Sequence, residues 1–234
     1  MRALGVVAVL CWAALAQAQV EKAADEWLQK SFQAYSQLQS LQSKTTLTVL
    51  MVTPRIPDGS PIQKYLYAYT AQAPARLNLL VKDLNAQGEG QRYVCDGQTF
   101  KAGDESKPVA NSGAALLEQL AEAGIAPSYD LVFLHGGKSS QERFRKQITQ
   151  LKVAGESEKQ VTLAGRIKNE RGKEDTLEIV IDKETLLIRA LRIRSEVKIE
   201  DQPGAFVLVM EFEPTPNVAI SEQTFQDSPD PSKP

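Results

Sequence analysis

Apolar residues recur at every second position through most of this chain, and this alternation limits the fold more than any other feature of the sequence. A period of two is typical of a β-strand with one buried face. Short connections rich in Gly, Pro and Asp separate the alternating segments, so successive strands should be antiparallel. In the C-terminal half, strands are expected at approximately Gln147–Gly155, Gln160–Asn169, Thr176–Asp182, Leu187–Glu200 and Ala205–Glu213.

The N-terminal half carries strand and turn signals of its own. Alternation over residues 46–51 predicts a first strand, and Tyr, Leu and Ala residues over 65–69 predict a second. The segment Pro54–Pro61 between them holds three prolines and an Asp-Gly pair, which predicts a loop. Asp96-Gly97 lies between two further short strands and is a strong signal for a tight β-hairpin.

Two regions have helical periodicity instead. From Val20 to Gln42, apolar residues are spaced by three or four and form one stripe, which predicts a long amphipathic helix. In the middle of the chain, Ala114–Ala123 predicts a short helix that ends at Gly124. A brief apolar stretch, Asp130–Leu134, follows it.

These elements predict a mainly β fold with α-helices. The expected architecture is a single, strongly curved antiparallel sheet, a half-open barrel of about 10–11 strands, covered by the N-terminal helix and a mid-chain helical insertion. Such a sheet can enclose an apolar cavity or be filled by its own core. Periodicity does not distinguish the two, because it does not encode packing density.

The N-terminus has the three parts of a secretory signal peptide: a basic start, an apolar run and a small-x-small site at Ala16–Ala18. We therefore predict a signal peptide over 1–18, one domain over 19–226 and a disordered tail over 227–234. Export to the periplasm follows, and the mature protein should not span a membrane, because no second apolar segment is long enough. A lipid anchor at Cys11 is the competing interpretation.

Few residues could carry chemistry. His135 is the only histidine, without a second ligand at zinc spacing, and no Gly-x-Ser-x-Gly motif occurs. A loop or surface position beside two glycines is expected for His135, and a buried strand position for Cys95. The net charge of −2 does not indicate the concentrated basic surface that nucleic-acid binding requires. The sequence predicts no catalytic residue, no metal site and no cofactor.

The apolar strand faces are the candidate binding surface, although they could equally be packed core. Tyr65, Tyr67 and Tyr69 suit a pocket wall, because each ring combines an apolar body with a polar tip. A basic strand, Arg189–Arg194, is a solvated face or a docking surface for a partner. The candidate ligand-binding residues are Leu47, Val49, Met51, Tyr65, Tyr67, Tyr69, Leu77, Leu79, Leu208, Met210 and Phe212, and the candidate lid residues are Trp27, Leu28, Phe32, Leu116 and Leu120.

Several short motifs occur in an order that resembles the LolA-like superfamily of periplasmic lipoprotein and lipid carriers, and in particular a branch of predicted periplasmic proteins without assigned function. They are Tyr35-x-x-Leu38-x-x-Leu41, Ala75-Arg76-Leu77, the hairpin Tyr93–Phe100, and Phe212-x-Pro214-x-Pro216-Asn217-x-x-Ile220 before Thr224-Phe225. The resemblance implies a half-open barrel of about eleven strands, closed by helices, with acyl chains against its concave wall. The loop Pro54–Pro61 and the middle insertion depart from the carrier pattern, and no residue aligns with the carrier's lid-holding arginine.

Together these observations predict a non-enzymatic envelope protein that holds a lipid or lipoprotein acyl chain. The alternative is a protein-interaction or envelope-stress sensor domain with a filled core and an envelope protein as its partner. An envelope hydrolase that uses His135 is a third hypothesis.

Overall fold

The computed structural model describes residues 22–169, 171–199 and 201–226. The predicted signal peptide and the C-terminal tail lie outside this range. Within it, eleven antiparallel strands form one sheet in the order β6-β5-β4-β3-β2-β1-β11-β10-β9-β8-β7. The strands are β1 (Ser40–Thr53), β2 (Ile56–Gln72), β3 (Arg76–Asp83), β4 (Gln91–Asp96), β5 (Thr99–Ala102), β6 (Glu105–Pro108), β7 (Ile148–Glu156), β8 (Gln160–Lys168), β9 (Glu174–Asp182), β10 (Ile188–Ile199) and β11 (Gln202–Pro216).

The sheet is curved and open, because β6 and β7 lie at its two ends and do not pair with each other. The first and last strands meet at its centre, where Leu47 lies opposite Met210. This pairing joins an N-terminal half, β1–β6, to a C-terminal half, β7–β11. The structure confirms the predicted half-open antiparallel sheet.

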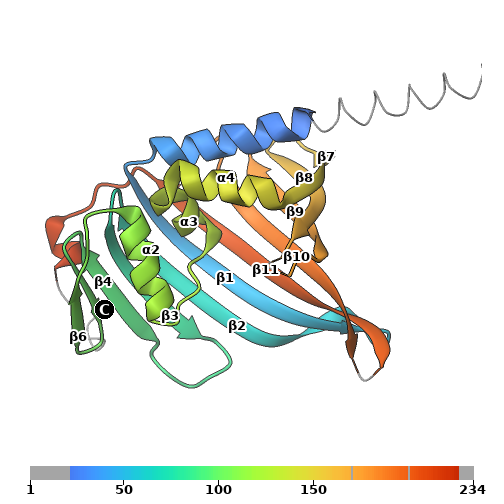
Figure 1. The fold of residues 1–234 in the computed structure, drawn as a ribbon, viewed down its shortest axis with the longest axis horizontal. Coiled ribbons are helices and arrows are strands. Elements are labelled where there is room, and N and C mark those ends of the chain that lie inside the picture. The colour runs from blue at the N-terminus through green and yellow to red at the C-terminus, as the bar shows by residue number, and fades with distance from the viewer. Residues whose placement is uncertain (1–21, 170, 200, 227–234) are drawn as a thin grey trace, which may run out of the picture.

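Helices cover one face of this sheet (Figure 1). An N-terminal helix occupies residues 22–37, and the middle insertion contributes α2 (Gly113–Glu122), α3 (Tyr129–His135) and α4 (Gly137–Gln147). Ser112 caps α2, since its Oγ accepts a hydrogen bond from the amide of Ala115 at 3.3 Å. Gly124 follows α2 with φ of +75°, as expected for a glycine stop. A 3₁₀ helix, η1 (Glu222–Phe225), follows β11.

The predicted N-terminal helix is too long at its C-terminal end. It ends at residue 37, and Leu41 lies in β1 between Ala71 and Pro216. The spacing of Leu41 from the preceding apolar residues matches a helix only by coincidence. Its conformation is determined by pairing with β2 and β11, which are distant from the helix in the sequence. Asn217 fixes the chain reversal: its amide donates to the carbonyl of Ser40 at 2.8 Å.

The predicted loop Pro54–Pro61 is also mostly strand. Only residues 54 and 55 form the turn, and β2 begins at Ile56. Pro57 and Pro61 are compatible with a strand here because β3 pairs with β2 only from Tyr65 onward, so this part of β2 has one open edge. Register shifts in β1 near residues 49–53 accommodate the irregular pairing.

The hydrophobic core lies between the helices and the concave face of the sheet. Phe133 of α3 is at its centre, with ring centroids 5.2 Å from both Phe32 and Phe144 and 5.6 Å from Tyr35. Leu177 contributes from the opposite side, on β9, and is completely buried. Among the described residues, no helix has the length and apolar character needed to cross a membrane.

Candidate ligand-binding site

The predicted ligand-binding residues share the concave face of the sheet. Strand alternation and register place them in neighbouring cross-strand rows. One row runs Leu191–Met210–Leu47–Tyr65, and the next toward the helices includes Phe212, Thr45, Tyr67 and Val81. Those that the structure buries are Leu47, Tyr67, Tyr69, Leu77, Leu79, Met210 and Phe212, and those left half-buried are Val49, Met51, Tyr65 and Leu208.

Four of the five predicted lid residues belong to the N-terminal helix or α2 and face the core. Leu28, Phe32, Leu116 and Leu120 are buried in the core. Trp27 is half-buried at the rim of the N-terminal helix, with the Nζ of Lys30 4.7 Å from its ring centroid. The covered part of the concave face, defined here as the strand residues buried beneath these helices, is therefore packed with side chains.

A second part of the same face extends beyond the helices. Figure 1 shows β1, β2, β10 and β11 continuing past the helical layer. We call the apolar surface on their far ends the open trough. Phe206 is 39% exposed there, whereas Met210, four residues further along β11, is 5% exposed. The open trough consists of Val49, Met51, Tyr65, Ile193, Phe206 and Leu208.

The register makes the open trough continuous. Ile193, Leu208 and Val49 form one row, which ends at Gln63 on one side and continues on the other into the buried Leu177 of β9. The next row outward is Ser195–Phe206–Met51–Ser60. The surface is thus apolar in its middle, with hydroxyl and amide groups at its margins except on the β9 side, where it joins the buried core at Leu177. It can take up an apolar chain through the hydrophobic effect, while the margins offer hydrogen bonds to a polar end group.

A buried polar cluster ties α3 to the covered part. Tyr69 of β2 donates its hydroxyl hydrogen bond to the carboxylate of Asp130, and Ser128 Oγ donates to the same carboxylate at 2.5 Å. Asp130 is 1% exposed, and burial raises the pKa of its carboxyl, although the hydrogen bonds from Ser128 and Tyr69 act in the opposite direction. Sequence reasoning missed this cluster; its one signal is an acidic residue at the start of an apolar stretch.

His135 is buried at the end of α3, which corrects the predicted loop or surface position. Its Nδ1 lies 3.0 Å from the carbonyl oxygen of Pro74, and burial lowers its pKa from 6.5 to about 4. The helix around it, not the neighbouring glycines, determines its environment. Cys95 is a buried strand residue, as predicted, and burial raises the pKa of its thiol. The described part of the chain holds no group of three His, Cys, Asp or Glu residues placed to bind a metal ion.

No protein-family model matches the sequence, and neither does any curated protein. Solved structures do match. LprF from Mycobacterium bovis aligns with a TM-score of 0.49 and 11% identity over 91% of this chain and 98% of its own. The LolA superfamily protein NE2245 from Nitrosomonas europaea gives 0.32 and 9% over 87% and 97%. The MucA/MucB complex of Pseudomonas aeruginosa gives 0.42 and 17% over 88% of this chain and 61% of the matched one.

This chain therefore spans about three fifths of the length of the matched chain in the MucA/MucB complex. The structural matches include a LolA superfamily protein. At identities of 9–17%, the similarity concerns the fold alone.

Proposed function

We propose that this protein is an exported, non-enzymatic binding protein of the bacterial periplasm, which holds the acyl chain of a lipid or lipoprotein against the open trough. The observation that carries the proposal is the partial exposure of this continuous apolar surface, with Phe206 exposed and the other five residues half-buried, on a sheet whose remaining concave face is packed. Exposed apolar surfaces of this kind are typical of binding sites. Export rests on the predicted signal peptide.

The structure favours a particular place for the cargo. Leu77 and Leu79 of β3 are completely buried in the covered part, so an acyl chain could reach them only if the helices moved. Val49 and Leu208, by contrast, are half-buried, so part of each side chain is already accessible. An acyl chain would bind at the open trough first, and binding would contribute about 0.8 kcal/mol for each methylene group that it buries.

The polar margins determine which end groups the trough tolerates. Three of the four ends of its two rows are Ser60, Gln63 and Ser195, which offer hydroxyl and amide groups but no charge; beyond Ile193 the remaining end meets the buried Leu177. These side chains can hydrogen-bond to an ester or amide linkage, the groups that join acyl chains to glycerol or to a protein amine. The trough should accordingly select for chain length and linkage more than for headgroup charge.

Leu208→Glu tests this function, because it places a carboxylate in the middle of the trough at a half-buried position. The matched control is Val209→Glu, the next residue on β11, which faces the opposite side of the sheet. Both variants are exported and purified gently from a diderm envelope, and native mass spectrometry measures their bound lipids.

We expect acyl-containing adducts on the wild type and on Val209→Glu, and their loss from Leu208→Glu. Circular dichroism and thermal unfolding show whether each variant remains folded. Equal adducts on a folded Leu208→Glu variant would contradict the proposed site. A wild type without adducts that also fails to take up a fluorescent fatty acid would contradict the proposed function.

The alternative function is a protein-interaction or envelope-stress sensor domain. Phe206 supports it, because an exposed aromatic residue on an apolar face is typical of a protein-binding hot spot. The basic strand Arg189–Arg194 is less suited to dock a partner, because two of its arginines already lie beside carboxylates. Arg194 pairs with Glu196 at 2.7 Å, and Arg189 lies 3.6 Å from Asp182. Capture of an envelope protein by fully delipidated wild type, lost in Phe206→Ala, would favour this function over lipid binding.

A further inference from the structure

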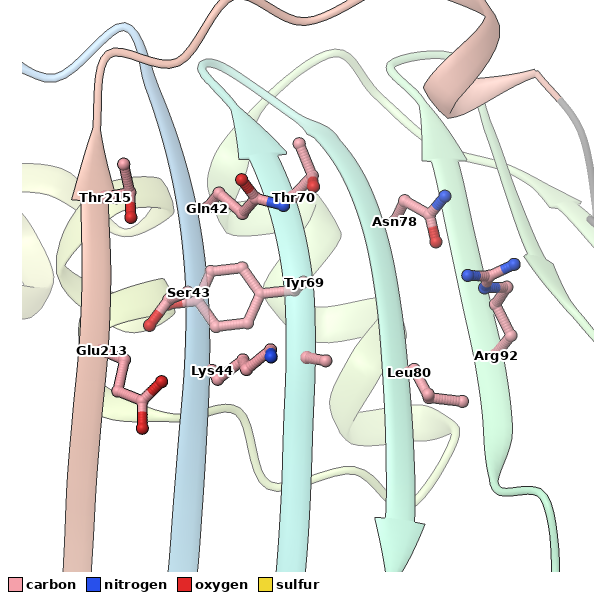
Figure 2. Close-up of a pocket in the computed structure, with 11 residues that line it drawn as sticks. Gln42, Ser43, Lys44, Tyr69, Thr70, Asn78, Leu80, Arg92, Glu213 and Thr215 are labelled. Atoms are coloured by element: carbon pink, nitrogen blue, oxygen red, sulfur yellow. The ribbon is translucent and has the colours of Figure 1, made fainter. Parts of the chain in front are cut away.

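The convex face of the sheet carries a polar hollow of about 510 Å³, on the opposite side from the trough. Figure 2 views it with the helices behind the strands. Strand register arranges its side chains in two adjacent rows that cross β11, β1, β2, β3 and β4. The first row is Thr215–Gln42–Thr70–Asn78, and the second is Glu213–Lys44–Ala68–Leu80–Arg92.

The second row has a low, apolar middle between two cations. Ala68 and Leu80 separate Lys44 from Arg92, so the backbones of the two basic residues lie roughly 14 Å apart, three strand spacings. Figure 2 shows the Lys44 side chain extending along the row toward β2. The methyl group of Ala68 is the smallest side chain of the row, and this leaves open space between the cations.

Neither Lys44 nor Arg92 forms a salt bridge in the described part of the chain. Among the described residues, no Asp or Glu oxygen lies within 4 Å of Lys44 or Arg92, although Glu213 is the register partner of Lys44. The Nε of Arg92 is buried and has no hydrogen-bond partner in this part of the chain. An unpaired guanidinium and a nearby ammonium favour an anion between them.

The first row supplies neutral hydrogen-bonding groups. Asn78 donates its Nδ2 to the carbonyl of Thr224 at 2.8 Å, which fixes the amide and leaves its Oδ1 as an acceptor. The side chains of Gln42, Thr70 and Thr215 form no hydrogen bond with other described residues, so their hydroxyl and amide groups are available to a ligand. Figure 2 shows this row running parallel to the cationic one.

We propose that this convex hollow binds an acidic sugar of one or two rings. The carboxylate or phosphate group would lie between Lys44 and Arg92, and the ring hydroxyls would hydrogen-bond to the row of Gln42, Thr70 and Asn78. The C–H face of the ring would rest on Ala68 and Leu80. A volume of about 510 Å³ lies in the usual range for small-molecule sites. The site is independent of the trough, because the sheet separates them.

The test is an NMR titration of the full chain with four probes: glucuronate, glucose 6-phosphate, glucose and inorganic phosphate. We expect glucuronate and glucose 6-phosphate to shift the amide resonances of β1, β2 and β3 around the hollow. The two acidic probes also distinguish a sugar acid from a sugar phosphate as the preferred class. Glucose and inorganic phosphate should each bind at least about tenfold more weakly than the better acidic sugar, because glucose has no anionic group and inorganic phosphate has no sugar ring.

Lys44→Ala tests the cationic row without risk to the core, because Lys44 is exposed. We expect it to weaken binding of the acidic sugar by about tenfold, the loss typical of one charge-assisted hydrogen bond. Lys64→Ala is the matched control: it removes an exposed lysine from the same face, two rows further along the strands, and should leave binding unchanged.

Three outcomes would overturn the proposal. They are equal binding of glucose and glucuronate, inorganic phosphate that binds as tightly as glucose 6-phosphate, and the absence of resonance shifts around the hollow with any probe. Acyl-chain binding by the Lys44→Ala variant should remain unchanged in each case, which keeps the two sites experimentally separate.

Discussion

The covered part and the open trough of the concave face are built from the same strands and the same alternation, yet one is core and the other is surface. On β1, Leu47 is buried and Val49 is half-buried; on β11, Met210 is buried and Phe206 is exposed. The difference lies in what is above them: helices cover one end of the strands and stop short of the other (Figure 1). Alternation therefore specifies which face is apolar, and helix placement specifies how much of it remains available.

The largest expected contrast in stability is between two phenylalanines. Phe133→Ala should lower the free energy of unfolding by about 3–5 kcal/mol, because it leaves a cavity among packed rings in the covered part. Phe206→Ala should change it by less than about 1 kcal/mol, because the ring is already exposed. Urea denaturation measures both. Equal losses would mean that the trough is core as well.

The covered part should also respond to acid through His135. Its pKa of about 4 in the folded state lies below the ordinary value of 6.5, so the unfolded chain binds the proton more tightly between these values. The contribution of neutral His135 to the free energy of unfolding is complete above pH 6.5 and is lost as the pH falls to 4. The total loss is about 3 kcal/mol. Denaturation curves at pH 4.5 and 7 measure it.

His135→Asn is the informative variant for that prediction, since its side-chain amide can still donate to the carbonyl of Pro74 but does not titrate. We expect it to lose less stability than the wild type between pH 7 and 4.5. Asp130 acts in the opposite sense in both proteins, because burial raises the pKa of its carboxyl, and it therefore cancels in the comparison. Identical pH dependence in the two proteins would contradict the buried position of His135.

A smaller effect should come from the hydrogen bond that ties α3 to the sheet. Tyr69→Phe removes the hydroxyl that donates to the buried carboxylate of Asp130, and should cost about 1–3 kcal/mol in unfolding free energy. Tyr67→Phe, two residues earlier on the same face of β2, is the control. Its expected cost is less than about 0.5 kcal/mol, because the Tyr67 hydroxyl has no hydrogen-bond partner among the described residues.

The smallest expected effect is the change in the binding free energy of a fatty acid with its chain length. Each methylene group removed from a saturated fatty acid should weaken its binding to the wild type by about fourfold, the factor equivalent to about 0.8 kcal/mol. Isothermal titration of a homologous series of fatty acids measures this slope. An affinity that does not change with chain length would mean that the trough does not bury the chain, and would remove the basis for selection by length.

Local signals in the sequence predicted the elements well. Asp96-Gly97 forms the expected hairpin, because a glycine with φ of +97° and an aspartate that accepts two backbone amides define that turn without tertiary help. Leu41 and Pro61 were assigned to the wrong elements, because pairing with strands distant in the sequence overrides local spacing and proline signals there.

The site could be predicted only in part. Alternation identified the apolar face, including Val49 and Leu208, but not the boundary between its covered and open ends, because no local pattern encodes the reach of the helices. The pairing of Asp130 with Tyr69 and the convex row from Lys44 to Arg92 depend on register between residues far apart in the chain. Register of this kind is a property of the folded sheet.

The most direct test of the central claim is methyl NMR of the wild type with a stearic acid that carries a nitroxide spin label near its methyl end. We expect strong broadening of the methyl signals of Val49, Ile193 and Leu208 in the open trough, with those of Leu77 and Leu79 in the covered part less affected. Stronger broadening of Leu77 and Leu79 than of the trough residues, or uniform weak broadening of all five, would contradict a binding site at the open trough.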